Sequence, residues 1–155
     1  GWGMAKYELY IIDEKVAQFF YGKEKTIFQL FQEYSTSQSK LKEILGKQIS
    51  YITIPIPSLR IHRLLMQHLH GRKDFFVHQG IYSIENPKSS AKLTLQDRKM
   101  LLDSSGNIDG ELIFFEVLGK LEYNLFAIET GEERYGWIRP VKGKKPSKEE
   151  IRLGK

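Results

Sequence analysis

The chain has 155 residues, of which 41% are hydrophobic and 28% are charged, and its formal net charge is +5. This balance is ordinary for a globular protein and argues against disorder, and the length favours one domain, which we place at residues 4–142. The sequence has no apolar run close to the roughly 20 residues of a membrane helix, and no cysteine for a disulfide or a thiolate metal site. Because no signal peptide follows Met4, we expect a cytoplasmic protein.

Both ends of the chain lie outside this predicted domain. Residues 1–3 precede Met4 and are typical of a cloning scar. The segment from Lys142 to Lys155 holds six Lys or Arg and two Glu, so it supplies +4 of the net charge and leaves the body near neutral. Nucleic-acid-binding modules usually cluster their charge on one folded face. We therefore expect residues 143–155 to be a poorly ordered basic tail.

The first predicted elements are a strand and a short helix. Residues 6–13, "KYELYIID", alternate in the manner of a strand but carry apolar side chains on both faces, which indicates an inner strand. Asp13 can cap a helix that runs through Phe20, and Gly22 suits the turn that ends it.

Two longer helices are predicted next. The segment 23–35 has apolar residues at helical spacing, which predicts a stripe facing the core: Ile27, Leu30, Phe31 and Tyr34. The segment 40–53 is also helical by pattern. Gly46 lies in its middle and costs about 1 kcal/mol relative to Ala, so it is a point at which this helix can break.

The double Ile-Pro sequence that follows stops the helical pattern. Ile54 and Ile56 each precede a proline and are restricted to extended conformations. Ser58 can cap a new helix, which we expect to bury a line of apolar residues and to end at Gly71. That line consists of Ile61, Leu65 and Leu69.

The second half of the chain is predicted to be rich in strands. Segments 74–85 and 91–103 are strand-like, 109–121 is a mostly buried helix, and 123–141 is a terminal hairpin. Strands joined by short turns pair antiparallel, so the predicted fold class is α+β. We expect a single domain with a mostly antiparallel sheet of about five strands, packed with three to four helices in the order β-α-α-α-β-β-α-β-β.

No pattern of residues predicts catalysis, although a small-molecule enzyme with a carboxylate or a histidine in an unrecognised cleft stays open as an alternative. His62, His68 and His70 are separated by six, two and eight residues, whereas a helical metal pair needs an i,i+4 spacing. Tyr135 and Trp137 lie among basic residues, as in a base-stacking surface, but their alternation along a strand favours the core. A nucleic-acid-binding module made of the terminal hairpin and the basic tail remains the alternative to a protein-binding role.

The segment "VAQFFYG", residues 16–22, carries more apolar surface than one core contact requires. As a helix, it spreads its apolar side chains over roughly 200° of arc, whereas a helix on a globular core needs a stripe of about 100°. Val16 and Phe20 form one i,i+4 ridge, and Ala17 and Tyr21 form a second. One ridge can pack inward while the other meets a partner, and periodicity does not decide between them.

Gln48 is a second anomaly, because it falls inside the apolar arc of its predicted helix. A buried glutamine must satisfy its amide or cost on the order of 1–3 kcal/mol. Either Gln48 bonds the backbone inside the core, or the stripe of Ile44, Gln48 and Tyr51 faces outward toward a partner. An apolar patch with a polar group on it commonly marks a protein interface.

Four segments allow a comparison with a known family, in which they occur in the same order along the chain. "IFQLFQEY" (27–34), "KQISYITIPIP" (47–57), "IFFEVL" (113–118) and "RYGWIRPVK" (134–142) closely resemble the sporulation inhibitor of replication family, SirA, of endospore-forming bacilli. The resemblance runs in collinear order from about Tyr7 to Lys142.

The resemblance implies a cytoplasmic inhibitor, not an enzyme, that binds the N-terminal domain of the replication initiator DnaA and keeps it from acting at the origin. It implies no cofactor, no membrane and no direct nucleic-acid contact. The family's partner surface matches Val16, Phe20, Gln48 and Tyr51 of this sequence. Val16 and Phe20 stand where the family has aromatic Phe and Tyr. The resemblance thus assigns Val16 and Phe20, and not Ala17 and Tyr21, to the outward ridge.

Overall fold

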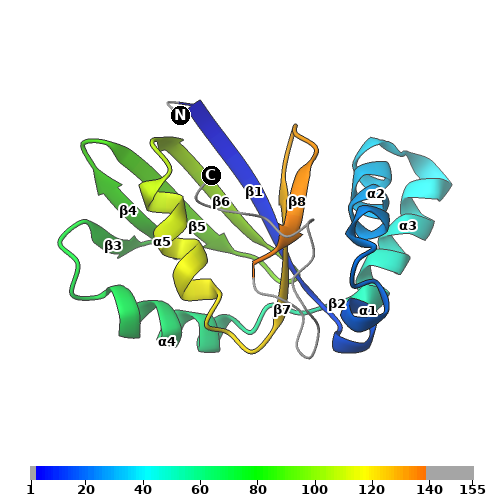
Figure 1. Ribbon diagram of the computed structural model, residues 1–155, viewed down its shortest axis with the longest axis horizontal. Coiled ribbons are helices and arrows are strands. Elements are labelled where there is room, and N and C mark those ends of the chain that lie inside the picture. Colours follow the sequence, from blue (N-terminus) through cyan, green and yellow to red (C-terminus); the bar gives the residue numbers. More distant parts are fainter. Residues whose placement is uncertain (1–2, 139–155) are drawn as a thin grey trace.

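The computed structural model describes residues 3–138, which form one antiparallel sheet with helices on both faces (Figure 1). Its strands are β1 (Gly3–Ile12), β2 (Thr53–Ile54), β3 (Phe75–His78), β4 (Ile81–Asn86), β5 (Ser89–Leu95), β6 (Met100–Gly106), β7 (Asn124–Glu129) and β8 (Arg134–Trp137). The strand order is β3-β4-β5-β6-β1-β7-β8, and β2 pairs with the end of β1. The predicted α+β class is confirmed, and β1 is an inner strand between β6 and β7.

Within residues 3–138, five helices cover the two faces of this sheet unequally. They are α1 (Glu14–Phe19), α2 (Glu24–Thr36), α3 (Ser39–Ile52), α4 (Ser58–Leu69) and α5 (Asp109–Leu118). In β1, Tyr7 and Leu9 belong to a core shared with α4 and α5, whereas Tyr10 and Ile12 belong to a second core shared with α1 and α2. The alternation of side chains along β1 therefore supplies two separate cores, one on each face (Figure 1).

The predicted number of strands is too low, because the described part of the chain contains eight strands where the sequence predicts about five. The segment 74–85 is a hairpin and not one strand. Gln79 and Gly80 turn it with φ values of 49° and 78°, and Gln79 is a residue type that gives no warning of a left-handed turn. The segment 91–103 also divides, at a turn in which the Gln96 amide donates to the Lys99 carbonyl at 2.9 Å. The predicted order of elements is therefore wrong in detail.

The helix signals are confirmed in part. The Asp13 carboxylate caps α1 by accepting hydrogen bonds from the amides of Lys15 and Val16, as predicted. Gly46 does not break α3, which runs unbroken to Ile52. The predicted Ser58 cap is wrong, because α4 already begins at Ser58 and follows Pro57 without any side-chain cap. A proline just before the first helical residue has a preset φ, so it starts the helix without a hydrogen-bonding side chain.

Trp137 is a core residue, as predicted, and Tyr135 packs against the same core. Trp137 is 1% exposed, and Tyr135 is half-buried with its ring stacked 4.5 Å from that of Phe28 in α2. Neither ring is available as a base-stacking platform, which removes one support of the nucleic-acid alternative. Residues 1–2 and the predicted basic tail at 143–155 lie outside the described residues. Within residues 3–138, no helix combines the length and the apolar character that crossing a bilayer requires.

Candidate partner-binding groove

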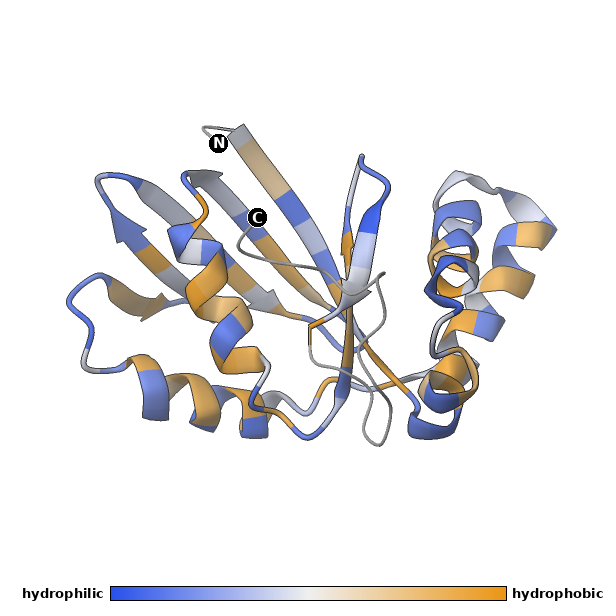
Figure 2. Ribbon diagram, viewed as in Figure 1, coloured by the Kyte–Doolittle hydropathy of each residue, from blue (hydrophilic) through white to orange (hydrophobic). Residues whose placement is uncertain are grey.

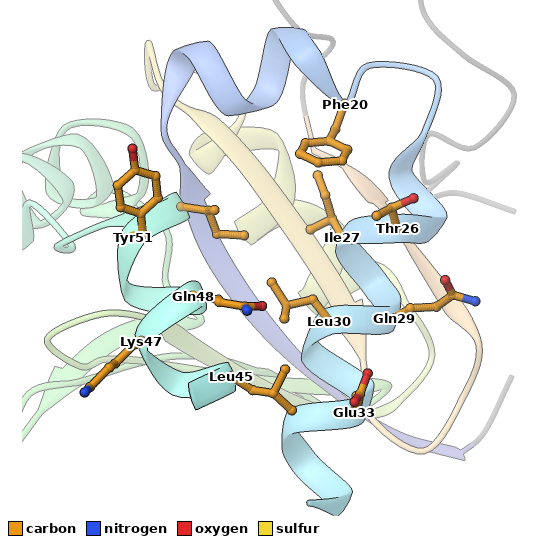
Figure 3. A pocket seen from close by; sticks show the side chains of 11 residues that line it. Phe20, Thr26, Ile27, Gln29, Leu30, Glu33, Leu45, Lys47, Gln48 and Tyr51 are labelled. Carbon is orange, nitrogen blue, oxygen red and sulfur yellow. The ribbon is translucent and has the colours of Figure 1, made fainter. Parts of the chain in front are cut away.

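Helices α2 and α3 lie side by side and leave an open groove of about 630 Å³ between them (Figure 3). Its floor is apolar and is made by Ile27 and Leu30 of α2 and by Leu45 of α3. The polar lining residues include Gln29 and Glu33 on the α2 side and Lys47 and Gln48 on the α3 side. An apolar floor with polar groups around it is the usual construction of a protein-binding surface.

The close approach of α2 and α3 explains why Gly46 is tolerated inside a helix. A Cβ atom added at Gly46 would lie 3.2 Å from Cε1 of Tyr34, a residue of α2. Glycine therefore allows the two helices to come together on the side of α3 next to Leu45, which is buried. The energy lost in helix propensity is offset by this packing, and the groove lies along the same pair of helices.

Three of the four sequence-predicted site residues line this groove. Phe20 closes one end of it, and Gln48 and Tyr51 project from α3 (Figure 3). Val16 is not among the lining residues; it is half-buried and packs against the core beneath α1. The structure therefore brings together residues about 30 positions apart in the chain. Val16 lies next to Phe20, whose amide donates to the Val16 carbonyl at 2.9 Å, but it does not line the groove.

The structure separates the two predicted ridges of the first helix only in part, because Ala17 is fully buried whereas Val16, Phe20 and Tyr21 are all half-buried. Phe20 and Val16 are half-buried and pack against the core, and the strongly exposed aromatic residue is Phe19, at 67%. The reason is the short length of α1. The helix ends at Phe19, the Lys23 amide then donates to the Phe20 carbonyl at 2.7 Å, and Gly22 adopts a φ of 85°. Extrapolating 100° per residue past Phe19 therefore misplaces the Phe20 ring.

The open question about Gln48 is decided in favour of the outward orientation. Gln48 is exposed, and the apolar residues on the same stripe of α3 are exposed with it, Ile44 at 45% and Tyr51 at 83%. Leu41 extends the stripe by one further turn. An exposed tyrosine next to an exposed amide is a combination that partner surfaces favour, because it offers apolar area together with hydrogen-bonding groups.

A buried carboxylate supports the end of the groove that carries Phe20. Glu24, at the start of α2, is fully buried, and its Oε2 accepts hydrogen bonds from the Gly22 amide at 2.7 Å and from Nε1 of Trp137 at 2.9 Å. The turn between α1 and α2 is thereby tied to β8. Buried charged groups are stable only when they are hydrogen-bonded, so Glu24 fixes the local backbone strongly.

Other polar clusters of the described chain lie away from the groove and have structural partners. Glu111 accepts hydrogen bonds from the Tyr7 hydroxyl at 2.6 Å and the Ser104 hydroxyl at 2.8 Å, inside the core beneath α5. Burial, followed by the bond to Glu111, raises the pKa of Tyr7 well above its ordinary value. His62 contacts the Tyr82 hydroxyl at 2.7 Å. Within residues 3–138, no three or more His, Asp or Glu side chains are grouped as ligands for a metal ion.

Comparison with known proteins gives the family. The family model described as sporulation inhibitor of replication protein SirA matches residues 5–142. The chain belongs to the SirA family. It is 39% identical over 140 residues to the sporulation inhibitor of replication protein SirA of Bacillus subtilis (strain 168), with 88% of this chain and 94% of that protein aligned. The family is named for an inhibitor of replication in sporulation, a regulatory role and not an enzymatic one.

Sequence reasoning missed several residues that shape the groove of this SirA-family chain. Leu30 was assigned to the core stripe of α2, yet it is only half-buried and lines the groove. The sequence does not single out Glu24, because nothing in it indicates that Trp137, 113 residues away, donates a hydrogen bond to this carboxylate. Leu41 does not line the groove but belongs to the exposed stripe of α3, and its position one turn before Ile44 is a weak signal of this in the sequence.

Proposed function

We propose that this protein inhibits the initiation of chromosomal replication during sporulation by binding the N-terminal domain of the initiator DnaA through the α2–α3 groove. Phe20, Gln48 and Tyr51 are the central contacts, and Val16 supports them from beneath α1. The inhibitor acts in the cytoplasm by occlusion, without a cofactor, because an occupied partner surface is unavailable to the factors that DnaA needs at the origin.

The observation that carries this proposal is the convergence of Phe20, Gln48 and Tyr51 on one apolar groove. Phe20 directly follows α1, and Gln48 and Tyr51 lie on α3, so all of α2 separates them along the chain. The groove is open and its floor is apolar, so water inside it is released when a partner side chain enters. Family membership supports the replication-inhibitor role, and the groove is a surface through which such a role can be exerted.

The geometry also suggests how binding energy is distributed. Tyr51 is the most exposed large residue of the groove, so it contributes little to folding and is free to bury its ring against a partner. Gln48 lies one helical turn away and can pair with a polar group of that partner. Interfaces concentrate their energy in a few such residues, and truncating one typically costs about 2 kcal/mol or more.

The test is a titration of the purified chain with the DnaA N-terminal domain by isothermal calorimetry. We expect the wild-type chain to bind and Tyr51→Ala to bind at least about 30-fold more weakly. Leu59→Ala is the matched control, since Leu59 is 62% exposed but lies on α4, away from the groove. It should change the dissociation constant by less than about twofold.

Two results would contradict the proposal. A wild-type chain that does not bind the domain would remove DnaA as the partner. Equal affinities for Tyr51→Ala and Leu59→Ala would move the site away from the groove. The affinity should also depend weakly on salt; a steep decrease with salt in a DNA-binding titration would instead favour the nucleic-acid alternative.

A further inference from the structure

The last turn of α3 carries Tyr51, and its backbone is held by a residue from a distant part of the chain. Arg98 lies in the turn between β5 and β6, and its Nη2 donates hydrogen bonds to the Ser50 carbonyl at 3.0 Å and the Thr53 carbonyl at 2.7 Å. The same nitrogen lies 3.1 Å from Oγ1 of Thr53. Two N–H groups therefore serve three oxygens, and the two carbonyls stand on either side of Tyr51.

This contact replaces a cap that α3 lacks. Helices commonly end with a glycine or with a basic residue in the last turn, and α3 has neither, since its last turn contains no basic residue and Thr53 follows Ile52. The Arg98 guanidinium brings a positive charge to the negative end of the helix dipole and satisfies carbonyls that would otherwise have no partner. Arg98 does not line the groove, so it acts from behind the helix.

The same turn of α3 is also joined to the start of α1. The Asp13 amide donates to the Ile52 carbonyl at 2.8 Å, while the Asp13 carboxylate caps α1. The Arg98 turn is itself fixed, because the Asp97 carbonyl accepts from the Ile56 amide at 2.8 Å. The end of α3 is thus the point at which α1, which Phe20 directly follows, and α3, which carries Tyr51, are held relative to each other.

We propose that Arg98 is a positioning residue of the partner-binding site, which holds the last turn of α3 so that Tyr51 faces the groove in the binding geometry. Because Tyr51 is 83% exposed, packing of its own ring does little to fix it, and the backbone must do so. This inference rests on the proposed function. It assigns a role to a residue that is far from the groove in the sequence and that no partner needs to touch.

The test compares Arg98→Met with Arg60→Met, measured for dissociation constant and for association and dissociation rates toward the DnaA N-terminal domain. Arg60 is an exposed arginine of α4 that donates to the Tyr123 hydroxyl at 3.0 Å, so its loss matches the charge change without touching α3. We expect Arg98→Met to bind about 10-fold more weakly through faster dissociation, and Arg60→Met to bind as the wild type does. Loss of charge alone would instead slow association and weaken its salt dependence.

A double-mutant cycle separates positioning from general destabilisation. In a Tyr51→Ala background, Arg98→Met should change the affinity by less than about twofold, because the ring that it positions is gone. A tenfold effect in both backgrounds would overturn the proposal. Thr53→Val is a milder second variant, should Arg98→Met fold poorly. It removes the Oγ1 contact with Arg98 together with the hydrogen bond that Oγ1 donates to the Ile49 carbonyl at 2.7 Å, and both contacts hold the last turn of α3. An expected weakening of about two- to threefold supports the proposal, whereas unchanged affinity contradicts it.

Amide hydrogen exchange in the free protein provides a readout that does not depend on the partner. The amides of Asp13 and Thr53 donate to the Ile52 and Ile49 carbonyls, at the turn that Arg98 holds. They should exchange at least about 10-fold faster in Arg98→Met and at the wild-type rate in Arg60→Met; unchanged exchange in Arg98→Met overturns the positioning role. If the wild-type chain fails to bind DnaA, the proposed function falls, and these rates still decide whether Arg98 fixes the end of α3.

Discussion

The two helical layers of this protein treat their apolar residues differently. On one face of the sheet, α4 and α5 bury theirs in a core with β1 and its neighbours. On the other face, α1, α2 and α3 share a smaller core and leave Phe19, Leu41, Ile44 and Tyr51 exposed. In α4 only Leu59 is comparably exposed, and in α5, which is described throughout, no large hydrophobic residue is.

Hydropathy alone does not distinguish these layers. Figure 2 shows hydrophobic segments in α1, α2 and α3 as well as in α4 and α5. The layers differ in what those segments meet: α4 and α5 contact the sheet and each other, whereas α3 packs on α2 along one side and presents another apolar stripe to solvent. An amphipathic helix whose apolar stripe has no partner among residues 3–138 is typical of a protein interaction surface.

The largest expected effect lies in the layer made of α4 and α5. Phe114 of α5 is fully buried among the residues of the larger core, so Phe114→Ala should lower the free energy of unfolding by about 3–5 kcal/mol. Urea denaturation measures this change. Affinity for the partner, corrected for the unfolded fraction, should stay within about twofold of the wild type. A loss of affinity that remains after this correction would show that the layer of α4 and α5 also belongs to the binding surface.

The next largest effect concerns Phe20, which belongs both to the smaller core and to the lining of the groove. Because its ring is half-buried and also lines the groove, Phe20→Ala should weaken partner binding roughly 30-fold and also lower the free energy of unfolding by about 1–2 kcal/mol. Calorimetry and urea denaturation of the same variant measure both. Unchanged affinity with a large loss of stability would assign Phe20 to the core alone.

Trp137→Phe tests the buried contact beneath the groove with a smaller change. The variant keeps an aromatic ring but removes the Nε1 donor, so Glu24 loses one of its hydrogen bonds inside the core. We expect a decrease of about 1–3 kcal/mol in the free energy of unfolding. Tyr123→Phe is the control, because it removes an exposed hydrogen bond from Arg60 and should change stability by less than about 0.5 kcal/mol. Equal effects for the two variants would mean that the Glu24 contact is weak.

The sequence predicted the elements of this fold better than their arrangement. Periodicity found the inner strand β1 and the helices, because those signals are local. It missed the turn at Gln79, since the left-handed conformation there is imposed by the pairing of β3 with β4 and is not favoured by glutamine. It also did not predict that the Phe20 ring packs inward, because the end of α1 depends on Gly22 and on the distant contact between Glu24 and Trp137.

In the candidate site too, local features could be predicted from the sequence, whereas contacts between distant residues could not. That Gln48 and Tyr51 share a stripe follows from helical spacing alone. That Phe20 joins them follows from the family resemblance, and the groove is consistent with it. The supporting contacts of Glu24 and Arg98 join residues 113 and 45 positions apart, and a single sequence carries no signal for pairings at such distances.

The smallest expected effect tests the close approach of α2 and α3. Gly46→Ala should gain up to about 1 kcal/mol in helix propensity, but its Cβ would lie 3.2 Å from Cε1 of Tyr34, a ring that already has the Lys42 ammonium 4.8 Å from its centre. We expect these effects to offset one another, leaving the free energy of unfolding within about 0.5 kcal/mol of the wild type.

Gly46→Val adds two more methyl groups against the same ring and should destabilise by about 1–3 kcal/mol, because α2 and α3 must then separate. Separation widens the groove, so affinity should decrease for Gly46→Val and not for Gly46→Ala. If Gly46→Ala instead stabilised the protein by the full propensity difference, the two helices would be loosely packed. The groove between them would then not be a preformed feature of the α1–α3 layer.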